Sequence, residues 1–338
     1  MRANSFAQRL LDWWVIHGRH DLPWQVERTA YRVWVSEIML QQTRVATVIP
    51  YFERFMASFP DLEALAAADL DDVLALWSGL GYYARARNLH AAARICVGQH
   101  GGTLPDKPAL LRELPGIGGS TANAIVAQAL DRRAPILDGN VKRVLARHAG
   151  IEGWPGRSAI TRELWQQAEA RTPDEQARDY TQAIMDLGAT VCTPRNPACS
   201  DCPVATDCRA RQEDRVSVLP TKKPKRSRPR RAVVLVLIHN EDGELLLQRR
   251  APTGIWGGLW SLPPIDELPL ENTGPTCQQI EHHFTHFILD IEVRIADLKQ
   301  FSDVADDDQL QWMRPEQALR AGLPRPIRQI IESTTTPS

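Results

Sequence analysis

Apolar residues recur at helical spacing over the N-terminal two thirds of the chain. From residue 6 to residue 211 they follow one another at intervals of three and four, as in Val33, Trp34 and Ile38. No segment of this region alternates between apolar and polar residues in the manner of a strand. We therefore predict an all-helical domain over residues 1–217.

The pattern changes after a basic segment, residues 218–231, which contains three prolines and seven Lys or Arg residues. This composition is typical of a solvated linker. Residues 232–238 then favour a strand, and a following turn sequence predicts that residues 245–248 return as the second strand of a hairpin. Residues 287–295 alternate between apolar and polar, which predicts a half-buried strand. We expect a separate α/β domain over residues 232–338.

Charge is divided unevenly between these two regions. Residues 1–231 carry 32 Lys and Arg against 25 Asp and Glu, a net +7, and residues 232–338 carry 8 against 16, a net −8, which together give the overall −1. A basic helical region is suited to a polyanionic partner. No apolar run reaches the roughly 18 residues that would span a bilayer, and residues 1–18 fit an amphipathic helix, not a signal peptide.

Cysteines are concentrated in one short loop. Four of the six lie within residues 192–208, and Cys96 and Cys277 stand alone. This crowding predicts a metal site in a reducing compartment and not a disulfide framework. Four thiolates from one loop can hold a 4Fe-4S cluster, whereas structural zinc usually takes two Cys-x2-Cys pairs well apart in sequence, so the spacing favours the cluster over zinc. The predicted ligands are Cys192, Cys199, Cys202 and Cys208.

A glycine-rich turn, LPGIGGSTA at residues 114–122, lies between two predicted helical stretches, residues 107–113 and 121–130. Such a hairpin exposes backbone N–H groups at a helix N-terminus, where a phosphate oxygen can bind without sequence preference. Gly116 and Gly118 are therefore candidate DNA contacts. An ordinary helix connection with glycine as a cap is the alternative.

Two carboxylates are candidates for acid–base chemistry. Glu37 shares the apolar face of a predicted helix with Val33 and Trp34, so desolvation should raise its pKa, as a general acid requires. A buried structural salt bridge is the alternative. Asp138 precedes a helical pattern, so it could be an N-cap or a carboxylate that stabilises positive charge on a sugar. The spacing does not separate these two roles.

The hairpin and the cysteine loop, in this order, resemble the helix-hairpin-helix DNA glycosylases with a cluster loop, which include endonuclease III and MutY. Three segments resemble the MutY-type adenine glycosylases in particular: VWVSEIMLQQT at 33–43, GLGYYARARNLH at 79–90 and ILDGNVKRVLAR at 136–147. The resemblance covers nearly the whole chain. It implies a helical glycosylase domain with an iron–sulfur cluster loop, followed by a Nudix-like α/β domain.

The resemblance also implies the reaction. The residue matching Glu37 protonates adenine at N7 and later assists water, the one matching Asp138 stabilises an oxocarbenium-like sugar, and Asn140 helps to hold Asp138. Ser120 stands where enzymes that also cut the backbone carry a Schiff-base lysine, which favours a monofunctional glycosylase, although an incidental imine through Lys142 stays open. The expected substrate is adenine opposite 8-oxoguanine, or opposite guanine, in duplex DNA.

Further residues are implied to read the DNA. By resemblance, Gln42 and Tyr82 wedge beside the lesion and Thr43 contacts 8-oxoguanine. Ser120 belongs to the hairpin that contacts the DNA. Trp24 and Gln182 match positions near the adenine pocket.

The C-terminal domain resembles the Nudix-like domain with which MutY-type proteins recognise 8-oxoguanine. Its Phe284, Thr285 and His286 stand where family members usually show Phe-Ser-His, so the hydroxyl is retained. On a regular strand His283 and His286 would lie on opposite faces, which disfavours a metal site. The domain lacks an R-E-x-x-E-E sequence for magnesium, so we expect it to recognise DNA and not to hydrolyse nucleotides.

The sequence leaves two alternatives to an adenine glycosylase open. A bifunctional glycosylase–lyase acting on oxidised pyrimidines is disfavoured by Ser120 and by the additional C-terminal domain. A DNA-binding protein without activity is disfavoured by the presence of Glu37 and Asp138. We expect a cytoplasmic, nucleoid-associated monomer with no membrane contact.

Overall fold

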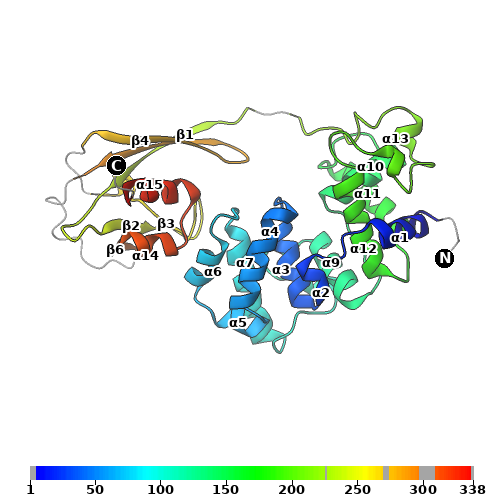
Figure 1. Ribbon diagram of the computed structural model, residues 1–338, viewed down its shortest axis with the longest axis horizontal. Coiled ribbons are helices and arrows are strands. Elements are labelled where there is room, and N and C mark those ends of the chain that lie inside the picture. Colours follow the sequence, from blue (N-terminus) through cyan, green and yellow to red (C-terminus); the bar gives the residue numbers. More distant parts are fainter. Residues whose placement is uncertain (1–4, 225–226, 269–273, 297–308, 336–338) are drawn as a thin grey trace. The chain divides into compact units, whose positions relative to one another are not determined.

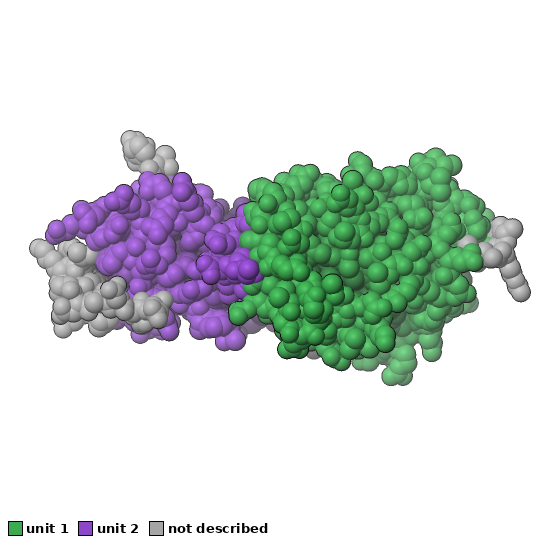
Figure 2. All heavy atoms as spheres, turned by 90° about the horizontal axis from the view of Figure 1, so that it is seen from below, with its two compact units in different colours: residues 1–66, 91–225 green, residues 67–90, 226–338 purple. Residues whose placement is uncertain are grey.

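The computed structural model describes residues 5–224, 227–268, 274–296 and 309–335. The chain divides into two compact units, one of residues 1–66 with 91–225 and the other of residues 67–90 with 226–338 (Figures 1 and 2). This division differs from the domain limits predicted from the sequence at residues 67–90. None of the helices in the described ranges is long and apolar enough to cross a membrane.

Helices follow one another from Phe6 to Gln212, and no strand occurs among the described residues of this region, as the helical spacing predicts. They are α1 (Phe6–His17), α2 (Pro23–Val26), α3 (Ala30–Leu40), α4 (Val45–Ser58), α5 (Leu62–Ala67), α6 (Leu70–Trp77), α7 (Ala84–Gln99), α8 (Pro108–Leu111), α9 (Gly119–Leu130), α10 (Gly139–Ala149), α11 (Ser158–Arg171), α12 (Ala177–Asp186) and α13 (Arg209–Gln212). A π-helical turn, Leu187–Val191, continues α12, and a 3-10 turn, Cys199–Asp201, lies in the cysteine loop.

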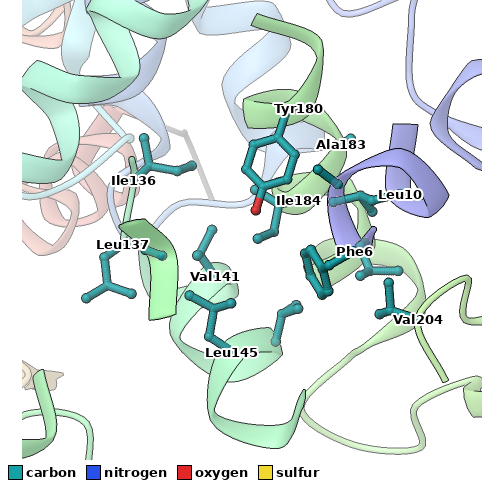
Figure 3. Packing of buried hydrophobic residues seen from close by; sticks show 14 of the residues in the cluster. Phe6, Leu10, Ile136, Leu137, Val141, Leu145, Tyr180, Ala183, Ile184 and Val204 are labelled. Atoms are coloured by element: carbon teal, nitrogen blue, oxygen red, sulfur yellow. The ribbon is translucent and has the colours of Figure 1, made fainter. Parts of the chain in front are cut away.

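A hydrophobic core joins α1, α10 and α12 in the first unit (Figure 3). Leu137 and Val141, on either side of Asp138, are 4% and 1% exposed and belong to this core. Full burial of such a side chain stabilises the fold by roughly 1.5–3 kcal/mol. The start of α10 is therefore held firmly, and with it the backbone of Asp138.

The glycine-rich turn connects α8 to α9. α8 is shorter than predicted, with four residues, and α9 begins at Gly119 with Gly118 as its N-cap. Gly116 has a φ of 78°, a left-handed conformation that glycine adopts without strain. A Cβ on Gly118 would meet no atom within 4 Å, so the fold itself leaves open space there.

Two three-stranded sheets form the second unit, with strand orders β1-β5-β4 and β3-β2-β6. β1 is parallel to β5, and the other pairs are antiparallel. A core of leucine and isoleucine side chains from both sheets packs with α15. The elements are β1 (Arg230–Leu237), β2 (Leu245–Arg249), β3 (Trp260–Ser261), a 3-10 turn (Ile265–Glu267), β4 (Thr276–His283), β5 (Ile288–Ile295), β6 (Leu310–Met313), α14 (Pro315–Arg320) and α15 (Arg325–Thr335).

The predicted hairpin between residues 232–238 and 245–248 is confirmed only next to its turn, where the N–H of Asn240 donates to the carbonyl of Glu244 and the N–H of Leu246 donates to the carbonyl of Ile238. β1 and β2 belong to different sheets, and they are joined by an isolated bridge between His239 and Leu245. Leucines of both strands enter one shared core, so the strands lie on two sides of that core and do not pair along their length. The predicted strand at 287–295 is confirmed as β5, although its last residue, Ile295, is exposed.

The histidine segment is a strand only as far as His283. β4 ends at His283 and β5 begins at Ile288, so Phe284, Thr285 and His286 lie in the connection between them. The backbone N–H of Phe284 donates to the carbonyl of Phe287 at 3.0 Å, which closes this connection.

The segment predicted as a linker is structured at both of its ends. Leu219 is buried, and its carbonyl accepts a hydrogen bond from Arg147 Nε at 2.9 Å. At the other end Arg230 opens β1 and pairs with Asp290 and Glu281. The composition of the segment does not show that Leu219 contacts the helical unit or that Arg230 pairs within a sheet.

Candidate active site

Glu37 lies in the last turns of α3, on the wall of an open cavity of the first unit. Thr29 caps this helix by accepting from the N–H of Arg32, as its position before the apolar pattern favours. Gln128, a buried residue of α9, donates from Nε2 to Glu37 Oε1 at 3.0 Å. Glu37 forms no ion pair with any described residue, so the structure does not support the salt-bridge alternative.

Asp138 caps a helix and also lies on the cavity wall, so the structure excludes neither of the two roles that the sequence left open. It is the N-cap of α10, because its Oδ1 accepts from the N–H of Val141 at 2.7 Å. It also lines the cavity that contains Glu37. Ser120 Oγ accepts from the N–H of Leu137 at 3.0 Å and so ties the hairpin helix to the residue before Asp138.

The two carboxylates differ in which form their surroundings favour. Burial and, to a smaller extent, the nearby charge of Asp138 raise the pKa of Glu37 to about 7, against the hydrogen bond from Gln128 that lowers it. Burial also raises the pKa of Asp138, but backbone N–H groups and the charge of Arg143 oppose that shift. With its pKa at about 7, Glu37 can hold a proton near neutral pH, whereas the backbone N–H groups and Arg143 act on Asp138 in favour of its ionised form.

The cavity has a volume of about 900 Å³, which lies at the upper end of the roughly 300–1,000 Å³ of a typical small-molecule site. Eight of the residues selected from the sequence lie on its wall: Trp24, Glu37, Gln42, Thr43, Ser120, Asp138, Asn140 and Gln182. Trp24 and Gln182 are buried, whereas Gln42 is exposed and has a left-handed φ of 60°. Gly116 and Gly118 lie in the turn before α9, outside the set of residues that line this cavity.

Sequence reasoning missed Arg143, which also lines the cavity. Its Nη2 donates to Asn140 Oδ1 at 2.8 Å and to the carbonyl of Gly188 at 2.6 Å, and its Nε donates to the carbonyl of Cys192 at 2.7 Å. The side chain of Asn140 is thus held by Arg143, while its backbone N–H bonds to Asp138. Asn140 and Arg143 are three residues apart on one predicted helix, and this spacing could have indicated that their side chains meet.

The other candidate DNA contacts lie in the second unit, and they are Tyr82, Phe284, Thr285 and His286. Tyr82 is 48% exposed with a left-handed φ of 51°, and its hydroxyl lies 3.2 Å from Thr285 Oγ1. The ring of Phe284 stacks on Phe287 with centroids 4.4 Å apart, and the ring of His286 packs edge-on against Phe287. The structure therefore brings Tyr82 and Thr285 together.

Cys192, Cys199, Cys202 and Cys208 line a second, small and apolar cavity of about 30 Å³. Burial and, to a smaller extent, the charges of the three other cysteines raise the pKa of the Cys202 thiol to about 11, against a backbone hydrogen bond at Val204 that lowers it. No group of three or more His, Cys, Asp or Glu side chains among the described residues is arranged to hold a single ion. Four neighbouring thiolates need cationic charge, which a polynuclear iron–sulfur centre supplies.

Purified protein is expected to be brown, with broad visible absorbance and with iron and sulfide in equal amounts, because the four thiolates fit a 4Fe-4S cluster. Cys199→Ser should reduce the iron content and the absorbance. The matched control is Cys277→Ser, since Cys277 is exposed and remote in sequence from the loop. Colourless wild-type protein with stoichiometric zinc would contradict the cluster.

Three family models match the chain. HhH-GPD superfamily base excision DNA repair protein matches residues 35–170, the iron-sulfur binding domain of endonuclease III matches residues 192–208, and the NUDIX domain matches residues 233–333. The first match contains both carboxylates of the cavity. The second contains all four cysteines of the loop.

Curated relatives and solved structures agree with these matches. The chain is 38% identical to an adenine DNA glycosylase of Buchnera aphidicola, with 98% of each chain covered. It is 45% identical to an adenine DNA glycosylase of Homo sapiens, over 62% of this chain and 40% of the human protein. The structure of a thermostable thymine-DNA glycosylase is similar with a TM-score of 0.56 and 27% identity, covering 62% of this chain and 95% of that one.

Proposed function

This chain belongs to the adenine DNA glycosylases, and from that premise we propose that it excises adenine opposite 8-oxoguanine, or opposite guanine, as a monofunctional and monomeric enzyme. It is a DNA N-glycosylase of base excision repair that acts on duplex DNA and binds one 4Fe-4S cluster. The observation that carries the proposal is a pair of carboxylates on one cavity wall, Glu37 with a pKa raised to about 7 and Asp138 with hydrogen bonds and positive charge that favour its ionised form.

The two carboxylates suit the two charges that develop when an N-glycosidic bond breaks. Adenine extruded from the duplex becomes a better leaving group when protonated, and Glu37 holds a proton near neutral pH for N7. The sugar becomes positively charged as the base departs, and ionised Asp138 stabilises it. Glu37, now ionised, then accepts a proton from the incoming water.

Ser120 supports hydrolysis without strand cleavage. Its side chain lines the cavity, and its hydroxyl is engaged by the N–H of Leu137, so it supplies no amine for an imine with the sugar. Lys142 lies four residues after Asp138 but is absent from the residues that line this cavity. The enzyme is thus proposed to leave an intact strand with an abasic site.

The cluster and the hairpin contribute to the DNA-binding surface in this proposal. When bound by its four cysteines, the cluster supplies a rigid structural centre for the loop. Arg143 joins the carbonyl of Cys192 in this loop to Asn140 beside Asp138. Gly118, with open space around its Cβ position, and Gly116 offer backbone N–H groups to a phosphate.

Recognition of 8-oxoguanine is proposed for residues of both units. Tyr82 and Thr285 place their hydroxyl oxygens 3.2 Å apart in the second unit, and Tyr82 presents an exposed aromatic ring for stacking beside an unpaired base. Phe284 and His286 flank Thr285 in the same connection. Gln42 and Thr43 are proposed to enter the duplex beside Glu37.

A panel of duplexes tests the proposal. The chain is incubated with duplexes that contain A opposite 8-oxoguanine, A opposite T, or an oxidised pyrimidine, and breaks are scored with and without alkali. We expect alkali-dependent breaks at the adenine of the first duplex. Breaks without alkali at an oxidised pyrimidine would favour the glycosylase–lyase, and the absence of breaks in all duplexes would favour a binding protein.

Excision is expected to slow as the pH rises through about 7, because the pKa of Glu37 is raised to about 7 and its protonated form is the donor. At lower pH Glu37 stays protonated, so its contribution to the rate levels off. Single-turnover rates across this range provide the measurement. Gln128→Leu removes the hydrogen bond that favours ionised Glu37, and should move the midpoint to higher pH. A rate that rises through this range would contradict the assignment.

A further inference from the structure

Asp186, at the end of α12, receives five hydrogen bonds although its side chain is almost completely buried. Three come from Arg19, through its backbone N–H and two guanidinium nitrogens, one from the indole of Trp14, and one from the amide of Gln182. Arg19 and Gln182 line the active-site cavity, whereas Asp186 does not. The reaction described above assigns Asp186 no part.

The two oxygens of Asp186 hold different parts of the protein. Oδ2 accepts from Trp14 Nε1 at 3.0 Å and from the backbone N–H of Arg19 at 2.9 Å, and so fixes the segment at the end of α1. Oδ1 accepts from Gln182 Nε2 at 2.8 Å and from the Arg19 guanidinium at 2.9 and 2.6 Å. Oδ1 therefore orients the two side chains that reach the cavity.

Contact with a carboxylate determines which end of the Gln182 amide is free. An ionised carboxylate accepts hydrogen bonds and cannot donate them, so Gln182 must turn its NH₂ group to Asp186. Its Oε1 has no hydrogen-bond donor among the described residues. Because Gln182 belongs to the cavity wall, the atom left for a ligand is an acceptor.

We propose that Asp186 is a positioning residue that makes Gln182 present an acceptor to the base in the cavity, and thereby selects a 6-amino purine over a 6-oxo purine. This inference rests on the proposed function. The 6-amino group of adenine donates to such an acceptor, whereas the 6-oxo group of hypoxanthine opposes it with a second acceptor. A site that leaves buried polar groups without partners discriminates strongly against the mismatched ligand.

Asp186→Asn tests the inference because asparagine has the same shape but only one acceptor oxygen. Trp14 and the backbone N–H of Arg19 are fixed and still require an acceptor, whereas the Arg19 side chain is 27% exposed and can turn its guanidinium from Oδ1 to solvent, so the asparagine NH₂ takes the place of Oδ1. Gln182 must then turn its oxygen to this NH₂ and its own NH₂ to the cavity. The cavity would offer a donor in place of an acceptor.

The experiment measures single-turnover excision of adenine and of hypoxanthine from otherwise identical duplexes with 8-oxoguanine opposite. Asp186→Asn should lower the ratio of adenine to hypoxanthine rates by about tenfold or more relative to wild type. Asp186→Glu, which only accepts, should keep the preference for adenine. Trp14→Phe, which removes one bond to Oδ2, controls for a purely structural effect and should leave the ratio unchanged.

Each outcome separates the inference from the function on which it rests. If wild-type protein excises neither base, the proposed function itself is contradicted. Wild-type protein that excises adenine, with a folded Asp186→Asn variant of unchanged ratio, would overturn the inference alone. If Asp186→Asn does not fold, Gln182→Met decides, because an unchanged ratio there would equally overturn it. Where both variants fold, adding Asp186→Asn to Gln182→Met should change the ratio no further, since Asp186 acts through Gln182.

Discussion

Replacing Glu37 by glutamine should lower the single-turnover rate of adenine excision by about a thousandfold, within the range that a general acid contributes. Glutamine keeps the size of the side chain, and its carbonyl oxygen can still accept from Gln128. It cannot deliver the proton that Glu37 holds near neutral pH. Because the fold and the cavity wall are retained, affinity for the duplex with A opposite 8-oxoguanine should change little.

Glu53→Gln is the matched control for this variant. Glu53 is an exposed residue of α4, so its replacement makes the same chemical change outside the cavity. Its excision rate should equal that of wild type. Binding is measured separately by titrating fluorescent duplex. A Glu37→Gln protein that turns over at the rate of the control would remove Glu37 from its role as acid.

Asp138→Asn is the second variant with a large expected effect, a loss of about 10²- to 10³-fold in the excision rate. Asparagine serves as well as aspartate at an N-cap, so the bond to the N–H of Val141 and the stability of α10 should be kept. What is lost is the negative charge beside the developing sugar cation. The charge effect is therefore separated from the capping effect.

Asp138→Ala provides the comparison, because it removes the cap as well as the charge. Loss of the cap should lower the free energy of unfolding by about 1 kcal/mol relative to Asp138→Asn, which denaturant titration measures. The two variants should be similarly slow in excision. An Asp138→Asn protein with wild-type rates would show that Asp138 is an N-cap and no more.

Much of the site could be predicted because its residues lie in strongly patterned elements. The spacing of Val33 and Trp34 placed Glu37 on the apolar face of a helix, and desolvation on that face raises its pKa. Asp138 before an apolar helical pattern indicated a cap, which α10 confirms. The helical fold of the N-terminal region and the strand β5 followed from periods of 3.6 and 2.

The rest depends on contacts between segments distant in sequence. Alternation of apolar and polar residues predicts a strand but not the strand with which it pairs. Nothing in residues 232–248 therefore showed that β1 pairs along its length with Ile288–Ile295 and not with β2. Asp186 is 172 residues from Trp14, and its bond to the indole exists only once α1 packs on α12. Arg143 likewise joins Asn140 to the cysteine loop through the folded chain.

The central claim is that this chain hydrolyses adenine from the duplex and leaves the strand intact. The most direct test counts free adenine by chromatography, together with intact strands, after wild-type protein acts on a duplex with A opposite 8-oxoguanine. We predict one adenine released for each alkali-labile site, with no cleavage before alkali, and no release above background by Glu37→Gln over the same time. Strand cleavage in step with base release, or no adenine at all, would contradict it.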